Sequence, residues 1–345
     1  MPRVRERPAE ARRETEVPAR RLRRTLLVLG LGVLAVLVAA GAAAAANGGF
    51  TPQHAHSPNA HRINQAYWLI VGFTVAIFVV VEAALVVFIV KYRSRGRNRT
   101  IEGSQLHGHT RIELIWTAIP VVIIVIIFSF VFYKLPGIAD APKASAAGGN
   151  LEVTVDAHQF YWQFTYPNGA VSIDELHLPV GRVAELTIRA EDVAHSWWIP
   201  QLGGKTDAIP GKVNHTWYEP GKTGTFYGQC AEFCGLFHER MLARVIVTSE
   251  ADYTSFVSRG AAKQLGKATW QGVCAKCHGM QGQGDYGPAI VSNPTLVDRA
   301  GLDAIVRNGF GKMPAVGNNW TPAQLDALVS YVKASVYKGA AASGG

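Results

Sequence analysis

Two long apolar runs constrain the fold of this 345-residue chain more than any other feature. One covers residues 66–90, with Glu82 as its one charged residue, and the other covers residues 114–133 without a charge. A helix needs about 20 residues to cross the roughly 30 Å hydrocarbon layer of a membrane, and each run is long enough. The sequence therefore predicts a transmembrane helical hairpin over residues 60–136.

Basic residues gather beside the apolar segments. The formal net charge is +9, and most of it comes from residues 1–24, with nine Arg against four Glu, and from the Arg-rich residues 91–111. Short basic loops stay in the cytoplasm, so everything after Leu135 is expected on the outer face of a bacterial cell membrane. This placement indicates membrane topology and lipid contact, and no nucleic-acid partner.

A third apolar run, residues 25–46, follows the Arg-rich head and ends in small residues. This pattern is typical of a secretory signal peptide cleaved near Ala46. The run is also long enough to remain as an uncleaved span, and both outcomes give the same topology. Residues 1–46 are therefore interpreted as an Arg-rich head with a signal peptide or an uncleaved span.

The amino-acid composition of the chain changes after a linker of small residues at 141–150. Short segments rich in β-branched and aromatic residues follow, such as "LEVTVDAHQFYWQFTYP" and "RMLARVIVTS", separated by Gly and Pro. This pattern favours a β sandwich or barrel of about 100 residues, here residues 150–250.

The stretch "QCAEFCGLFHERM" brings together Cys230, Cys234, His238 and Met241, and "DVAHSWWIP" offers His195 from a separate strand-like segment. Thiolate, imidazole and a distant thioether suit copper in electron transfer, and two close thiolates can bridge a pair of metal ions. A disulfide is an alternative outside the cytoplasm, but it leaves the histidine and the methionine unexplained. A structural zinc site is another, although such sites usually have closer Cys pairs and no Met.

The motifs "HSWWIP", "GGKTDAIPGKVN" and "YGQCAEFCGLFHERM" closely resemble subunit II of the haem–copper cytochrome c oxidases, over roughly residues 60–250. The resemblance implies a cupredoxin-like β barrel with a dinuclear copper centre, CuA. The implied ligands of its two copper ions are His195, Cys230, the backbone carbonyl of Glu232, Cys234, His238 and Met241. It further implies that the Glu232 carboxylate reaches a magnesium or manganese ion at the boundary with subunit I.

The resemblance also bears on Glu113 and on the aromatic cluster "HQFYWQF". Position alone leaves Glu113 either as an acid favoured by the helix N-terminal dipole or as a proton-handling group. The stretch "IELIWTAIP" resembles the family's second helix, which implies that Glu113 lies at the mouth of a proton channel into subunit I. Phe160 stands where many family members have a Trp that receives electrons from a separate cytochrome, so Tyr161 and Trp162 remain as the expected electron path.

The sequence "CAKCH" is the attachment motif of a c-type haem. Cys274 and Cys277 are expected to form the thioethers, and His278 to bind the iron. The carbonyl of Pro288, in the Gly-rich stretch that follows, is expected to accept the other ring N–H of His278 and to orient it.

Met313 is the expected sixth ligand of the haem iron, because His278 is the last histidine of the chain and "GKMPAV" resembles a distal-ligand loop. A His/Met pair raises the reduction potential. Thr321 to Gln324 reads as a capping box at the start of a closing helix. Residues 262–338 are therefore interpreted as an all-α class I cytochrome c domain.

Together these features predict a multidomain membrane protein that resembles subunit II of the caa-type oxidases of bacteria. Its expected role is to pass electrons from its own haem to CuA and on to subunit I, where a proton-translocating oxidoreductase reduces dioxygen to water. Expected partners are subunits I and III, and an upstream reductase or small cytochrome as donor. Two alternatives stay open: the copper-bearing subunit of a nitric oxide reductase, and a membrane-tethered carrier without a stable catalytic partner.

Overall fold

The computed structural model describes residues 51–93, 105, 107–143 and 149–339. Nearly all of them belong to the second of two compact units, which spans residues 54–345. The predicted signal region, most of the basic loop and part of the small-residue linker lie outside the described residues.

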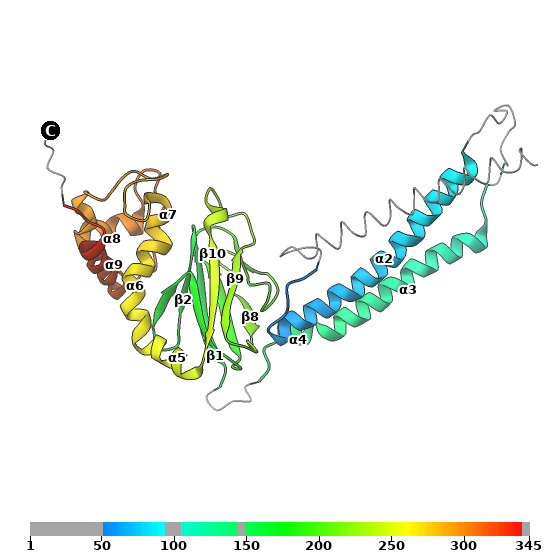
Figure 1. Ribbon diagram of the computed structural model, residues 1–345, viewed down its shortest axis with the longest axis horizontal. Coiled ribbons are helices and arrows are strands. Elements are labelled where there is room, and N and C mark those ends of the chain that lie inside the picture. The colour runs from blue at the N-terminus through cyan, green and yellow to red at the C-terminus, as the bar shows by residue number, and fades with distance from the viewer. Residues whose placement is uncertain (1–50, 94–104, 106, 144–148, 340–345) are drawn as a thin grey trace, which may run out of the picture. The chain divides into compact units, whose positions relative to one another are not determined.

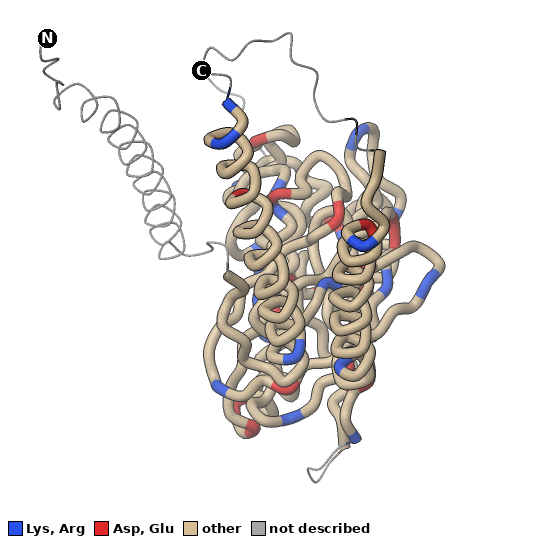
Figure 2. Tube along the Cα trace, turned by 90° about the vertical axis from the view of Figure 1, so that its right-hand side faces the viewer, with Lys and Arg blue, Asp and Glu red and all other residues tan. Residues whose placement is uncertain are grey.

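The predicted hairpin consists of α2 (Pro58–Tyr92) and α3 (Thr110–Lys134), followed by the short α4 (Pro136–Ala139). Both long helices are apolar enough to cross a membrane, and charged residues are few along them (Figure 2). The hairpin is joined to the β domain near its base, where the buried Asn59 donates to the carbonyls of Ile138 and Trp217 at 3.2 Å each. A buried amide needs such partners, so this contact fixes the base of α2.

Two five-stranded sheets form the β domain (Figure 1). One has the order β3-β2-β1-β5-β8 and the other β4-β10-β9-β6-β7. The strands are β1 (Leu151–His158), β2 (Tyr161–Thr165), β3 (Val171–Ile173), β4 (Glu175–Pro179), β5 (Ala184–Ala190), β6 (His195–Trp198), β7 (Thr206–Ala208), β8 (Asn214–Tyr218), β9 (Gly224–Cys230) and β10 (Leu242–Thr248).

Most strand pairs are antiparallel, but β1 pairs with β5 and β4 with β10 in parallel. Parallel neighbours need long crossover connections, which composition alone does not reveal. The inward side chains of the two sheets form one core, in which Trp162, Phe164, Trp197 and Leu186 are fully buried. The predicted cupredoxin-like β domain is confirmed.

A helical segment without an intervening loop connects the β domain to the C-terminal domain. It consists of α5 (Glu250–Ser255), a π-helical turn at 256–260, α6 (Ala261–Thr269), a second π-helical turn at 270–274 and α7 (Ala275–His278). Ser249 caps its start by accepting from the Asp252 amide. The attachment motif "CAKCH" thus ends a helix that begins directly after the last strand of the β domain.

The C-terminal domain closes with α8 (Arg299–Asn308) and α9 (Pro322–Ser335), which pack with α6 around Trp270, Leu325 and Leu328. Thr321 caps α9 by accepting from the Gln324 amide at 3.2 Å. The predicted capping box is only half present, since the Gln324 side chain instead donates to Gln163 of β2. The predicted helical cytochrome c domain is confirmed in its fold class.

Candidate metal centre

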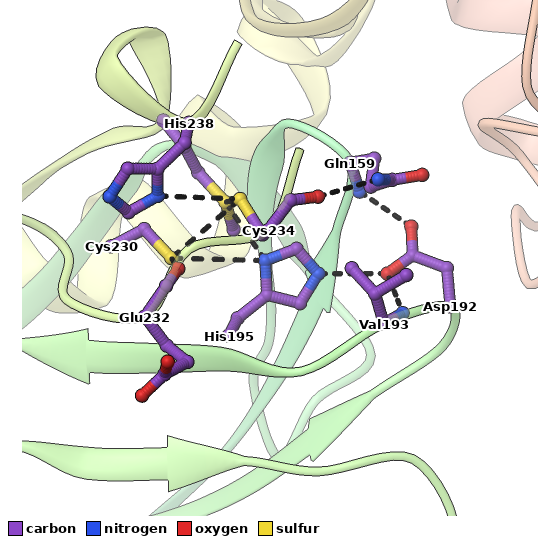
Figure 3. A network of polar contacts seen from close by, with 9 residues as sticks. Gln159, Asp192, Val193, His195, Cys230, Glu232, Cys234 and His238 are labelled. Carbon is purple, nitrogen blue, oxygen red and sulfur yellow. Dashed lines mark hydrogen bonds and ion pairs between the residues drawn. The ribbon is translucent and has the colours of Figure 1, made fainter. Parts of the chain in front are cut away.

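Four of the side chains predicted to bind copper, those of His195, Cys230, Cys234 and His238, lie close together (Figure 3). His195 begins β6, Cys230 ends β9, and Cys234 lies in the loop that follows. His238 starts a single 3-10 turn, His238–Arg240, and Met241 comes directly before β10. The start of β6, the end of β9 and the loop between β9 and β10 therefore supply every predicted side-chain ligand.

Contacts among these side chains are close. Nδ1 of His195 lies 3.2 Å from the Met241 sulfur and 3.8 Å from the Cys230 sulfur. The Cys234 sulfur lies 3.9 Å from that of Cys230, 3.8 Å from that of Met241 and 3.5 Å from Nδ1 of His238. His195, both cysteines and Met241 are buried, whereas His238 is partly exposed, so most of the cluster is withdrawn from bulk water.

Cys230 and Cys234 are free cysteines, and they affect each other's protonation. The neighbouring Cys234 thiol, aided by the ring of His195, holds the pKa of Cys230 well below its usual range. The hydrogen bond to Cys230, together with burial, raises the pKa of Cys234. The pair thus holds one thiolate readily, and a bound cation favours the second because metals bind thiolates.

Glu232 turns its backbone and its side chain in different directions (Figure 3). Its carbonyl oxygen lies 3.1 Å from the Cys230 sulfur, inside the cluster. Its carboxylate is about half exposed and lies 3.7 Å from the Lys205 ammonium. The carbonyl is therefore available to a metal in the cluster, and the carboxylate to a group outside it.

Asp192 and Gln159 support the cluster, and sequence reasoning missed both. Nε2 of His195 lies 2.8 Å from Oδ1 of Asp192. The other oxygen of Asp192 accepts from the backbone amide of Gln159 at 2.6 Å. The Gln159 side chain donates to the Cys234 carbonyl at 2.6 Å. A carboxylate on the outer nitrogen fixes the tautomer of a metal-binding histidine, so Nδ1 of His195 is left to face the sulfur atoms. An acid three residues before a predicted ligand, "DVAH", was the available signal.

The hydrogen bonds of these groups also set their protonation. Burial alone would lower the pKa of His195, but the bonds to Asp192 and Cys230 outweigh it and raise the pKa. Burial would raise the pKa of Asp192, and the bonds from His195 and two backbone amides lower it instead. Asp192 is therefore an anion at neutral pH, as a group that orients a ligand must be.

The haem-attachment motif has the predicted local contact. Nδ1 of His278 donates to the Pro288 carbonyl at 2.8 Å, which leaves Nε2 free to point away from that loop. Burial raises the pKa of Cys274 to about 12 and also raises that of Cys277. These two cysteines are thus thiols at neutral pH. The residues fit a c-type haem.

Met313 packs against the core of the C-terminal domain in a tight turn, closed by backbone bonds in both directions with Phe310. Met280 is instead exposed. Glu113, in the first turn of α3, accepts from the His109 amide at 2.8 Å and so caps its own helix. Its role in proton uptake, like the ligand role of Met313, stays a prediction.

Tyr161 and Trp162 point to opposite sides of β2. Trp162 lies in the core of the β domain, with its ring 6.1 Å from that of His195. Tyr161 belongs to the core of the C-terminal domain, although it comes from the β domain. The expected electron path thus has one residue facing each domain.

Comparison with protein families matches three consecutive parts of the chain. Residues 45–133 match "Cytochrome C oxidase subunit II, transmembrane domain", and residues 171–249 match "Cytochrome C oxidase subunit II, periplasmic domain". Residues 261–332 match "Cytochrome C oxidase, cbb3-type, subunit III". The order of these parts is the order predicted for hairpin, copper domain and haem domain.

Curated relatives agree with these family matches. Cytochrome c oxidase subunit 2 of Alkalihalophilus pseudofirmus is 33% identical over 247 residues, covering 66% of this chain and 72% of the relative. Probable cytochrome c oxidase subunit 2 of Rickettsia bellii is 32% identical over 232 residues, covering 61% and 82%. The crystal structure of the periplasmic domain of cytochrome oxidase subunit II of Bradyrhizobium japonicum shares 32% identity over 36% of this chain and 98% of that one, with a TM-score of 0.33.

The fold, the matched domains and the curated relatives all support the same conclusion. The family implies copper and haem c as cofactors, subunit I as a partner, and a membrane protein with an extracytoplasmic domain. The chain belongs to the cytochrome c oxidase subunit II family, carries a cytochrome c domain at its C-terminal end, and is an electron-transfer subunit of a haem–copper terminal oxidase.

Proposed function

We propose that this subunit passes electrons from its own c-type haem to a dinuclear copper centre, CuA, and from there to subunit I, where dioxygen is reduced to water. The observation that carries the proposal is the close cluster of two thiols, two imidazoles, one thioether and one carbonyl, most of which is buried. Copper bound there supplies a centre that gains and loses one electron.

The donor set fits copper better than the alternatives. A structural zinc site is usually tetrahedral with Cys and His ligands, and it gives no reason for the sulfur of Met241 to point into the cluster. A disulfide would join the two cysteines, which are free, and would leave His238 without a partner. Soft sulfur ligands with imidazole are the set that favours copper in electron transfer.

The chain's own residues hold this centre in a fixed geometry. His195 is fully buried and bonded to Asp192, and Gln159 bonds both Asp192 and the loop that carries Cys234. A rigid and largely buried site moves little when its charge changes by one electron, and small rearrangement keeps electron transfer fast.

The haem is proposed to be held by Cys274 and Cys277 as thioethers, with His278 and Met313 on the iron. The bond from His278 to the Pro288 carbonyl supports this, because it sets the ring orientation that an axial ligand needs.

The remaining proposals concern the surroundings of the subunit. The half-exposed carboxylate of Glu232 is proposed to reach a magnesium or manganese ion at the boundary with subunit I, and Glu113 to admit protons to that subunit. Subunit III and an upstream reductase or small cytochrome complete the proposed partners. The proposed location is the bacterial cell membrane, with copper and haem domains on the outer face.

The test uses the purified oxidase complex. Met241→Leu keeps the side-chain volume but removes the sulfur, and we expect it to stop reoxidation of the fused haem by dioxygen. Met280→Leu is the matched control, since that side chain is exposed and lies outside the cluster. Elemental analysis reports the copper content of each variant. Reoxidation at the unchanged rate in a copper-depleted Met241→Leu complex would rule out copper as the next carrier.

A further inference from the structure

The lysine inside the haem-attachment motif contacts the copper domain. Lys276 lies between the two motif cysteines, and its ammonium donates to Oδ2 of Asp174 at 2.6 Å and to the Phe160 carbonyl at 2.8 Å. The two charged side chains are only 16% and 17% exposed. An ion pair that is largely withdrawn from water and bonded on several sides is sensitive to loss of either partner.

Asp174 lies between β3 and β4 and is in turn bonded to Trp162 of β2, the strand that adjoins the copper site. Its other carboxylate oxygen accepts from the Trp162 amide at 2.9 Å, and its own amide donates to the Trp162 carbonyl at 2.8 Å. Its φ of 58° lies in the left-handed region, which Asp and Asn tolerate better than most residues. Lys276 and Asp174 thus link the haem motif to β2 through fixed backbone.

A second set of contacts lies on the outward face of β2. The Tyr161 hydroxyl donates to the Val316 carbonyl at 2.5 Å and accepts from the Trp320 indole at 3.0 Å. Gln324 donates to the side chain of Gln163 at 3.1 Å. The side chains of Tyr161, Gln163 and Gln324 are buried, so the outward face of β2 is not open to solvent.

The loop that carries the copper ligands also contacts the haem domain. Arg240 donates to the Lys276 carbonyl at 3.0 Å and to the Asp285 carboxylate at 3.1 Å. The rings of Phe237 and Tyr286 meet edge to face with centroids 4.9 Å apart. Contacts therefore reach from β2 to the copper loop itself.

The connection between the domains adds to this restraint. From Glu250 to His278 the backbone is continuously helical, so no loop is present to let the haem domain swing away. A fused domain on a flexible tether would instead visit its acceptor at an effective concentration set by the tether.

Resting on the proposed function, we propose that the haem domain is held in one docked position on β2 of the copper domain, with Lys276 and Asp174 as its clamp. The haem domain is then not a mobile carrier. One electron at a time leaves it for the copper domain from this position, without any bond or proton change. A separate cytochrome has no access to this face of β2 and must meet the haem domain instead.

The test compares Lys276→Gln and Asp174→Asn with Lys267→Gln in the complete oxidase. Asn keeps the left-handed backbone at position 174, so the variant removes the charge without backbone strain. Lys267 is an exposed lysine of α6, and among the described residues it has no ion pair, which makes it the matched control. Haem absorbance verifies that each variant carries haem.

Two measurements separate a docked domain from a mobile one. The first is the haem-to-copper electron-transfer rate after photoreduction of the haem, recorded in buffers of rising viscosity. We expect no viscosity dependence in the wild type and in Lys267→Gln, and a clear dependence in both clamp variants, where transfer waits for the domains to meet. The second is amide hydrogen exchange of segment 316–324. We expect this exchange to be about 30-fold faster in the clamp variants. At 1.4 kcal/mol per factor of ten, this corresponds to a decrease of about 2 kcal/mol in the free energy of local opening.

A wild-type rate that falls with viscosity would overturn the docked position, and so would clamp variants that exchange no faster than the control. The proposed function fails in a different way. Segment 316–324 could exchange more slowly in the wild type than in the clamp variants while no electron reaches copper in the wild type. In that case the docked position stands and the proposed electron route does not.

Discussion

The hydroxyl of Tyr161 offers the sharpest test of how the β domain and the C-terminal domain are joined. It donates to the Val316 carbonyl and accepts from the Trp320 indole, and all three residues are buried. Burial raises the pKa of Tyr161 well above its usual range, so the hydroxyl stays neutral and keeps both bonds at any working pH. Tyr161→Phe removes this hydroxyl and leaves the ring in place.

The expected cost follows from the two groups left behind. A buried donor or acceptor without a partner costs about 1 to 3 kcal/mol, and here one of each results. Tyr161→Phe should therefore lower the free energy of unfolding by about 2 to 6 kcal/mol. For two joined domains of about 150 to 250 residues in total, a loss of about 2 kcal/mol lowers the thermal midpoint by roughly 4 to 8 °C.

The assay is thermal unfolding of the detergent-solubilised chain, followed by haem absorbance and by tryptophan fluorescence. Tyr227→Phe is the control, because Tyr227 of β9 is 66% exposed and should change the unfolding free energy by no more than about 0.5 kcal/mol. If the midpoints of the two variants agree within error, the hydroxyl of Tyr161 does not bridge two buried groups and the domain contact described above is wrong.

Three further predictions concern the copper site, acid stability and proton uptake. Asp192→Asn should weaken copper binding about 10- to 100-fold in a chelator competition, with Glu191→Gln unchanged, because it loosens the orientation of His195. The ring of His177, whose Nε2 lies 3.8 Å from the Glu175 carboxylate, lowers the pKa of Glu175 together with Arg244, against the opposing effect of burial. Its stabilising contribution should thus be complete above the unfolded pKa of about 4.3 and be lost as pH falls through the lower folded pKa, so Glu175→Gln should flatten the decline of the thermal midpoint below about pH 4. Glu113→Gln should slow dioxygen uptake by the complex while copper and haem contents stay unchanged, and an unaltered rate would leave Glu113 as a helix cap alone.

The candidate ligands were predictable because most of them lie in one short loop. Cys230, Cys234, His238 and Met241 fall within thirteen residues, and soft ligands gathered so densely are typical of a metal site. The spacing of "CAKCH" similarly identifies a haem site without any knowledge of the fold. Local sequence also predicted the bond between His278 and Pro288, since both lie within one turn-rich segment.

Residues that act across large sequence distances were not predictable. Asp174 and Lys276 are 102 positions apart, and Tyr161 and Trp320 are 159 apart. No periodicity or spacing in the sequence relates such pairs. They meet because of the register of the sheet and the position of the C-terminal domain against the β domain. The parallel pairing of β1 with β5 was missed for the same reason.

The burial of strand β2 shows where the two domains meet. A strand of a two-sheet domain with one face in water should alternate apolar and polar side chains. The segment "YWQFT" follows this alternation from Trp162 onward, yet its first four residues, including the polar Gln163, are all buried. The strand is therefore covered on both faces, by its own core on one side and by the C-terminal domain on the other. Since Trp162 faces the predicted copper ligand His195 and Tyr161 faces the haem domain, this burial on both faces marks the contact on which the proposed electron route depends.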